Sequence, residues 1–452
     1  MLIKRKARRR HDLLQDPVGP TLFSMTVPTT IGVVAVISYL LVDTYFISLL
    51  GTSQLAALGF TFPATMLVTY FGVGLGIGTS ALVAKAIGAR NQLLAAELTF
   101  ASILLGLVLG LVLIVPGLGA SDPLFSGMGA ETALLPLIRQ YMSVWYFGIP
   151  LLLMQFAGTA VIRASGNTRL HGTLMTAGAV LNVILDPIFI FGWGPFPAFG
   201  IAGAALTTVT SWALTVIVIC YVLARKEGLL KFKWPGLGQI LDTWKKLGKI
   251  TVPAALANMI TPVAAAVITT TLATYGTHAV AAYGVINRVE SFIMIVVLGM
   301  SMSLPPFISQ NFGAGLLERV SLALRLSLRF VMFWQFALYL LVALAAPYIA
   351  AVFTADPAVR QLITLILRIL PASFAFQGMV VLTASCFNAL HAPRNALLTS
   401  LIRFFVFYVP LALFGAHLAD IPGLFTGAAI GNLLAGLLVT RWITAYVRNL
   451  QK

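Results

Sequence analysis

Apolar stretches of about 20 residues recur along the whole of this 452-residue chain, separated by short polar or glycine-rich segments. A helix of that length can cross the ~30 Å hydrocarbon core of a bilayer. We therefore predict an all-α integral membrane protein with twelve transmembrane helices, six in each half of the chain. The predicted spans lie near residues 21–50, 61–86, 94–120, 135–163, 168–193 and 202–224, and then near 249–275, 286–310, 320–353, 361–388, 394–418 and 423–447.

The second half of the chain repeats the first. Thr26–Pro28 returns as Thr251–Pro253, and Arg169 returns as Arg394, each 225 positions later (251 − 26, 394 − 169). A constant offset indicates two copies of one unit. Because an even number of spans leaves both copies in the same orientation, we expect two parallel six-helix repeats related by an axis along the membrane normal.

Charge is scarce and unevenly distributed. The chain is 59% hydrophobic and 9% charged, whereas soluble domains are about 25% charged. The net charge is +16, and in the twelve-helix topology all but four of the 29 Lys and Arg residues lie on one side; the four are Arg139, Arg288, Arg360 and Arg368. The positive-inside rule places that side, with both termini, in the cytoplasm, so we predict a multi-pass protein of the plasma (inner) membrane. Because the basic residues follow the membrane topology, we expect no nucleic-acid partner.

This topology divides the chain into five segments. We expect a basic cytoplasmic N-terminal tail (1–20), an N-lobe (21–224), a cytoplasmic linker (225–248), a C-lobe (249–447) and a cytoplasmic C-terminal tail (448–452). The linker mixes lysines with leucines and aromatic residues, which suits either a segment lying on the membrane surface or a solvated tether. Cys220 and Cys386 lie in apolar stretches and indicate neither a disulfide nor a metal site.

Two of the thirteen acidic residues, Asp43 and Asp186, lie well inside predicted spans. A charge there costs roughly 2.5–3.5 kcal/mol on insertion scales, so such residues are functional candidates; the alternative is a structural carboxyl hydrogen-bonded between helices. Both acids, and Thr208, should lie about seven residues, or ~10 Å, below the outer surface. Tyr39 and Asn182 stand one helical turn before the two acids and share their helix faces.

Two prolines lie on the helices that carry these acids. Pro187 cannot donate a hydrogen bond to the carbonyl of Val183, and Pro28 cannot donate to that of Ser24, which would let the first helix bend. The oxygens gathered here suit either Na⁺ or a proton shared between two acids. The predicted metal site is a Na⁺ site at Asp43, Asn182, Asp186 and Thr208. We expect no cofactor other than the coupling ion.

The repeat provides an internal comparison. At the offset of 225, the second half has Ile268 and Leu411 in place of the two aspartates. Ion chemistry is therefore predicted for the first half. Near the outer start of the eighth span, Arg288 and Glu290 form either a rim ion pair or gate, or a second titrating site.

Several stretches of the chain are distinctive in combination. They are Pro28 with Tyr39 and Asp43, RASGNTR (163–169), LNVILDPIFIFG (181–192) and GIAGAALTT (200–208). On these stretches the chain resembles the multidrug and toxic compound extrusion (MATE) family of secondary transporters, over nearly its whole length. The resemblance implies two lobes in a V shape around a central cavity, and drug efflux in exchange for inward H⁺ or Na⁺.

The first-half acids are most similar to those of the branch with the DNA-damage-inducible and archaeal members. This similarity implies an ion site formed by Tyr39, Asp43, Asn182, Asp186 and Thr208, with Ala204 as a carbonyl ligand. Another branch carries acids in the seventh and tenth spans. Residues 253–267 and 367–381 of this chain lack them.

The predicted function is a secondary active antiporter and not an enzyme. It would export small organic, cationic and amphipathic compounds in exchange for inward H⁺ or Na⁺. Met154 and Met175 would suit an adaptable apolar cavity, with ordinary helix packing as the alternative for each. Membrane lipid is the other expected partner. Two lobes in one chain can form the whole path, so we expect a monomer.

Two other functions stay open. A flippase for a lipid-linked precursor, from the same superfamily, would require a basic cavity for a pyrophosphate group, whereas the charges inside the spans here are acidic. An integral membrane transferase would require a cluster of His, Asp or Glu at the membrane interface, and the sequence has none.

Overall fold

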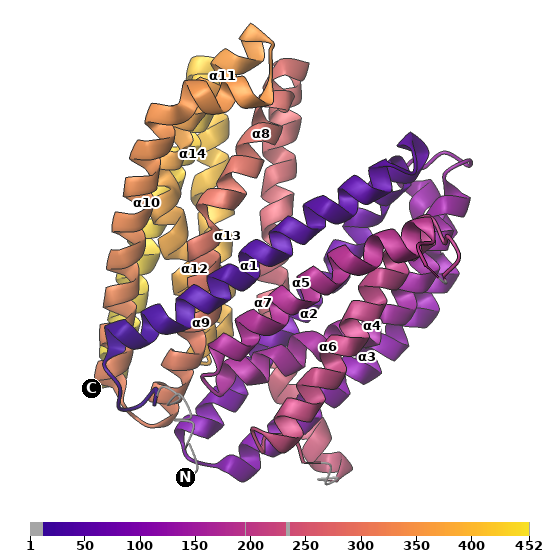
Figure 1. The fold of residues 1–452 in the computed structure, drawn as a ribbon. Helices are drawn as coiled ribbons and strands as arrows, with labels where there is room; N and C mark the ends of the chain where they lie inside the picture. Colours follow the sequence, from indigo (N-terminus) through magenta and orange to yellow (C-terminus); the bar gives the residue numbers. More distant parts are fainter. Residues whose placement is uncertain (1–11, 195, 232–235, 452) are drawn as a thin grey trace, which may run out of the picture. The chain divides into compact units, whose positions relative to one another are not determined.

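The computed structural model describes residues 12–194, 196–231 and 236–451, and Figure 1 shows the course of the chain. Helices make up nearly all of this part, and no strand occurs within it. The helices form two compact units. The first comprises Phe23–Ala255 with the segment that ends at Asp16, and the second comprises the chain from Leu256 onward with Pro17–Leu22.

The first unit is built around one central helix. Its elements are α1 (Val18–Ser48), α2 (Thr52–Gly88), α3 (Gln92–Gly127), α4 (Leu135–Ala164), α5 (Thr168–Phe191), α6 (Ile201–Arg225) and the first part of α7 (Leu237–Ala273). α4 packs against α2, α3 and α6, and it is the most buried of the apolar helices. Met142 and Leu153 of α4 are fully buried in the core of this unit.

The second unit repeats this plan with more breaks in its helices. Its elements are the rest of α7, α8 (Thr277–Ile293), α9 (Ile295–Gly313), α10 (Leu317–Phe353), α11 (Pro357–Ile369), the short 3₁₀ helix η1 (Leu370–Ser373), α12 (Phe374–Ala389), α13 (Pro393–Leu401), the π-helix η2 (Ile402–Tyr408) and α14 (Val409–Gln451). α12 packs against α9, α10 and α14. The span formed by α11 and α12 lies 225 residues after α4, so the repeat preserves the central position of this helix.

The helices account for the twelve predicted spans. Ten helices of the described chain are long and apolar enough to cross a membrane, and α8 with α9, bent by 45°, makes an eleventh span. The stretch Pro393–Gln451 contains two helices, because the backbone leaves the helical region at Ala419 and Asp420, where φ is −152° and 50°. Division at this kink gives the twelfth span, and the all-α prediction is confirmed.

The expected linker at 225–248 is partly helical. α7 begins at Leu237, before the predicted start at 249, because its first turns carry apolar side chains that pack on the first unit. Ile240 and Leu247 are buried, and the Trp244 indole donates to the carbonyl of Ala101 in α3 (2.9 Å). Residues 232–235 of the expected linker lie outside the described chain.

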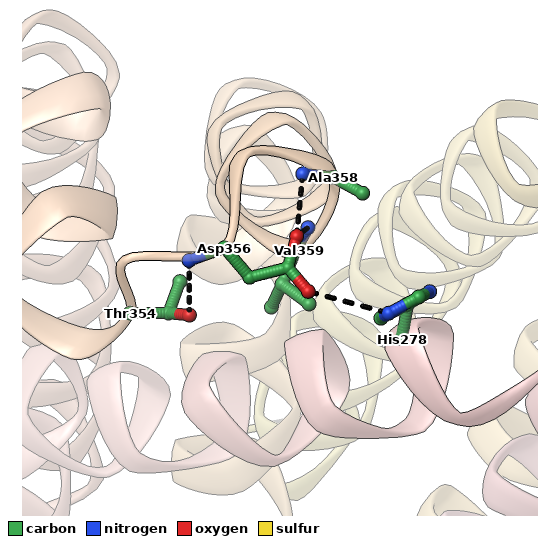
Figure 2. A network of polar contacts seen from close by, with 5 residues as sticks. All are labelled: His278, Thr354, Asp356, Ala358 and Val359. Carbon is green, nitrogen blue, oxygen red and sulfur yellow. Dashed lines mark hydrogen bonds and ion pairs between the residues drawn. The ribbon is translucent and has the colours of Figure 1, made fainter.

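Capping side chains satisfy several helix N-termini. Asn91 and Asn167 accept backbone hydrogen bonds at the starts of α3 and α5. Asp356 caps α11 by accepting from the amides of Ala358 (2.8 Å) and Val359 (3.4 Å). Figure 2 shows that its second oxygen faces the His278 ring of α8, at 3.3 Å from Nε2. Such caps satisfy amides that have no partner inside the helix.

Helices α1 and α5 cross at small residues. A Cβ atom on Gly172 of α5 would lie 2.1 Å from the carbonyl oxygen of Pro28 in α1, and one on Gly32 would lie 3.0 Å from the Met175 side chain. Glycine permits this close approach of two backbones, as is common between membrane helices. The crossing holds α1, which carries Asp43, beside α5, which carries the buried Asp186.

We predict that Gly172→Ala destabilises the first unit, because the added methyl group collides with the Pro28 carbonyl. Overpacking of this kind costs about 1–3 kcal/mol. The melting temperature of the detergent-purified protein should fall, whereas Gly119→Ala in α3, where a Cβ has no neighbour within 4 Å, should not lower it. Equal melting temperatures for the two variants would contradict the crossing.

Candidate functional site

Polar side chains from three helices of the first unit converge. Asp43 lies on α1, Asn182 and Asp186 on α5, and Thr207 on α6. The Asp43 and Asp186 carboxyls interact electrostatically, and the Tyr39 hydroxyl interacts with both. Asp186 is completely buried. The structure thus brings together the two acids, the tyrosine and the amide that the sequence identified.

Several oxygens of this cluster are unpaired in the part of the chain that the structure describes. Asp43 Oδ1, Asn182 Oδ1, both carboxylate oxygens of Asp186 and Thr207 Oγ1 are buried and lack hydrogen-bond partners among the described residues. The Thr207 hydroxyl acts on the Asp186 carboxyl without reaching hydrogen-bond geometry. Buried polar atoms are nearly always paired, so this set of unpaired oxygens, with carboxylates among them, fits an additional hydrogen-bonding or cationic ligand. A proton or a Na⁺ ion fits this set of hard oxygens.

No basic side chain compensates the acids. Within the part of the chain that the structure describes, no lysine, arginine or histidine forms an ion pair with Asp43 or Asp186 or interacts with either electrostatically. Two like charges in a membrane interior repel each other and are poorly solvated. A proton or a cation at this site would remove the repulsion between the two acids.

Tyr141 is a member of the cluster that sequence reasoning missed. It lies on the central helix α4, is buried, and interacts electrostatically with Asp43, Asp186 and Tyr39. Its own helix carries no acid within one turn, so the i, i+4 relation that identified Tyr39 and Asn182 does not apply to it. The only available signal was a phenol inside a predicted span.

Thr208 does not belong to the buried cluster, and its place is taken by Thr207. The Thr208 hydroxyl is half-buried and donates to the carbonyl of Ala204 within α6 (3.1 Å), whereas Thr207 is completely buried. Adjacent residues lie 100° apart around a helix, so they cannot face the same neighbour. Of the two neighbouring hydroxyls, the structure buries that of Thr207 and leaves Thr208, the residue predicted from the sequence, half-buried. The Ala204 carbonyl, proposed as an ion ligand, accepts this intrahelical bond.

The second unit holds a different polar cluster. Arg403, in the π-helix, is buried; its Nε donates to Asn432 Oδ1 (3.0 Å), and its guanidinium lies over the Phe404 ring at 4.4 Å. The Asn432 amide donates in turn to Ser373 Oγ (3.0 Å). Glu290 accepts from Gln377 (2.6 Å) and interacts electrostatically with Arg403. A carboxylate and a guanidinium thus balance each other in this unit.

The expected rim pair of Arg288 and Glu290 is not present. Arg288 is exposed, while Glu290 turns toward Gln377 and Arg403. Residues two apart on a helix point in different directions, which explains the separation. Glu290 is therefore part of an internal network of the second unit.

The remaining predicted residues lie in packed helices. Met154 packs against the core of the first unit, and Met175 lies in the crossing of α1 with α5. The helices continue through Pro28 and Pro187 without a break. Both methionines therefore lie in ordinary helix packing, which was the alternative to a place in the substrate cavity.

The chain matches one family twice. The MatE family profile matches residues 28–188 and again residues 253–414. The second match begins 225 residues after the first (253 − 28), the same offset that the sequence repeat shows.

Similar proteins cover almost the whole chain. It is 40% identical over 428 residues to the FAD transporter of Shewanella oneidensis (95% of each chain), and 26% identical over 412 residues to the multidrug export protein MepA of Staphylococcus aureus (89% of each). Among solved structures, it is similar to the Vibrio cholerae MATE transporter VcmN in the bent form (35% identity, TM-score 0.90, 95% and 98% covered). It is also similar to a MOP superfamily transporter of Pyrococcus furiosus (26% identity, TM-score 0.89, 97% and 98% covered).

The variants Thr207→Val and Thr208→Val should distinguish the roles of the two neighbouring hydroxyls. Each replacement removes one hydroxyl at nearly constant volume, and only Thr207 belongs to the buried cluster. A bound cation raises stability by mass action. We expect Na⁺, or acidification, to raise the melting temperature of native protein and of Thr208→Val, with a clearly smaller rise for Thr207→Val. The reverse order would restore the original assignment of Thr208.

Neutralising one acid in each unit should change stability in opposite directions. At pH 9 without Na⁺, Asp186→Asn should raise the melting temperature, because it removes repulsion from a carboxylate pair that has no counter-charge. Glu290→Gln should lower it by removing a charge-assisted hydrogen bond worth about 1.5–3 kcal/mol. Differential scanning fluorimetry of the purified variants measures both shifts. Shifts of the same sign would show that the two clusters do not differ in charge balance.

Proposed function

Because the chain belongs to the MatE family of multi-pass membrane transporters, we propose that it is a secondary active antiporter that exports organic compounds in exchange for an inward-moving cation. One observation carries this proposal: the buried oxygens of the first unit, with two carboxylates among them, have no positively charged partner in the described chain. Family membership also makes the protein a transporter rather than an enzyme.

The acid pair provides a means of coupling. When Asp43 and Asp186 are both charged, the repulsion between them acts between α1 and α5. A proton or Na⁺ removes the repulsion, stabilises a different arrangement of α1, and so shifts the balance between outward- and inward-open states. Pro28 removes one backbone hydrogen bond of α1 and lowers the cost of bending there. We favour H⁺ as the coupling ion, since one proton can be shared by two carboxylates, with Na⁺ as the alternative.

The membrane potential is sufficient to drive accumulation. One charge that crosses 100 mV provides about 2.3 kcal/mol. Because about 1.4 kcal/mol corresponds to a tenfold ratio, one inward charge supports roughly a 50-fold gradient of neutral cargo. A single coupling ion per cycle is therefore enough for useful export.

Two cargo classes have support from similar proteins. The 40% identity to an FAD transporter over 95% of the chain favours FAD as the first cargo to test. The 26% identity to a multidrug export protein supports amphipathic drugs, which we predicted from the sequence. The two classes differ in the sign of their charge: competition with a proton at the acids suits a cationic drug that binds near the ionised carboxylates, whereas the anionic FAD would have to bind away from them.

Transport in proteoliposomes tests the proposal. An imposed H⁺ or Na⁺ gradient should drive the movement of FAD or of ethidium by the native chain, and Asp43→Asn and Asp186→Asn should lower the initial rate at least tenfold. Asp242→Asn is the matched control, because Asp242 is exposed and pairs with Lys246 (2.6 Å) on α7. Gradient-driven transport by the two aspartate variants at the native rate would refute coupling through this site. The absence of transport of either cargo by the native chain would refute organic export.

A further inference from the structure

A groove runs along the surface of the second unit between α10, α12 and α14, helices that Figure 1 shows side by side. Its cavity has a volume of about 590 Å³, and a neighbouring hollow of about 260 Å³ shares Thr440 and Thr444 with it. Neither belongs to the buried cluster around Glu290 and Arg403. The polar clusters described above therefore do not account for the groove or for the neighbouring hollow.

The groove is polar at one end and apolar at the other. On α10, Ser321, Arg325, Arg329 and Phe333 line it at intervals of four residues, so they form one stripe along the helix. The stripe runs from basic to aromatic, and Phe333 is 75% exposed. Met379 of α12 is buried beneath it. At 1.5 Å per residue the stripe is roughly 18 Å long, close to the depth of one bilayer leaflet.

The polar end carries only positive charge. On α14, Thr440, Thr444 and Arg448 form a second stripe with the same four-residue spacing, and Arg441 lines the neighbouring hollow. No acidic residue lines either hollow, and none of the groove's arginines pairs with a carboxylate in the described chain. Thr440 Oγ1 is buried and has no hydrogen-bond partner there. The described lining thus offers positively charged donors and hydroxyl groups, and it contains no carboxylate.

The apolar end faces the surroundings of the helix bundle. Only 11% of the most apolar window of α10 is buried, and Phe336 and Leu341 are among its exposed side chains. In a membrane transporter such a surface contacts lipid chains. The basic end of the groove lies toward the start of α10 and the end of α14, which the positive-inside rule places at the cytoplasmic leaflet.

We infer that this groove binds an anionic phospholipid of the cytoplasmic leaflet. Its phosphate group lies among Arg325, Arg329 and Arg448, and an acyl chain follows Met332 and Phe333 toward the membrane interior. The lining has no carboxylate for the ammonium group of a zwitterionic lipid, and its apolar length has no role in binding free phosphate. Basic hollows between helices at the cytoplasmic side are typical sites for anionic headgroups.

Native mass spectrometry of the detergent-purified full chain tests this inference. Phosphatidylglycerol should bind more tightly than phosphatidylcholine with the same chains. The double variant Arg325→Gln/Arg329→Gln should weaken phosphatidylglycerol binding by about 30-fold, since each basic residue at a membrane surface contributes about fivefold. The control Arg225→Gln/Lys226→Gln removes two exposed charges at the end of α6 and should bind like the native chain.

A second variant tests the location without changing charge. Thr444 is exposed on the groove wall, so Thr444→Trp should fill the space with little effect on folding and should reduce phosphatidylglycerol binding while all arginines remain. Native affinity in this variant or in the double arginine variant would overturn the site, as would equal binding of the two lipids. Displacement of the lipid by millimolar inorganic phosphate would overturn the lipid as the occupant. Because these measurements do not involve transport, they are independent of the antiport proposal.

Discussion

The structure depends on the electrostatic cost of two carboxylates inside an apolar bundle. Asp43 and Asp186 lie on different helices of one unit, and the described chain provides no positive charge near them. A carboxylate in such a place is costly unless a proton or cation accompanies it. The stability of this unit should therefore depend on whether the two carboxyls are ionised or neutralised.

The packing around the cluster is arranged to tolerate this cost. Glycine at the crossing of α1 and α5 allows the two acid-bearing helices to approach, while the central helix α4 supplies Tyr141 from the third side. The second unit also has a central helix, but there the charge of Glu290 is compensated by an electrostatic interaction with Arg403. One architecture thus supports one charge-balanced cluster and one that is unbalanced. The two units share the arrangement of their helices and differ in the polar residues that they carry.

Much of the fold could be predicted from the sequence because it depends on long apolar runs and on the repeat. Span number and helix type follow from counting residues. The direction in which each side chain points does not follow, because successive residues of a helix point about 100° apart. One such step separates Thr207 from Thr208, and two separate Arg288 from Glu290. Tyr141 and Arg403 were missed as site residues since their partners lie on other helices. The kink at Ala419 and Asp420 falls between the predicted spans 394–418 and 423–447, so its place could be predicted, whereas its backbone angles could not.

The π-helix at Ile402–Tyr408 has a consequence for how the two halves correspond. A π-turn holds more residues than an α-turn, so it rotates all that follows relative to an uninterrupted helix such as α5. After Arg403, residues that are 225 positions apart in the two halves therefore no longer point in the same direction from their helices. An aspartate introduced at Leu411 would occupy the numerical counterpart of Asp186 and point in a different direction, so one substitution would not rebuild the acid pair in the second unit.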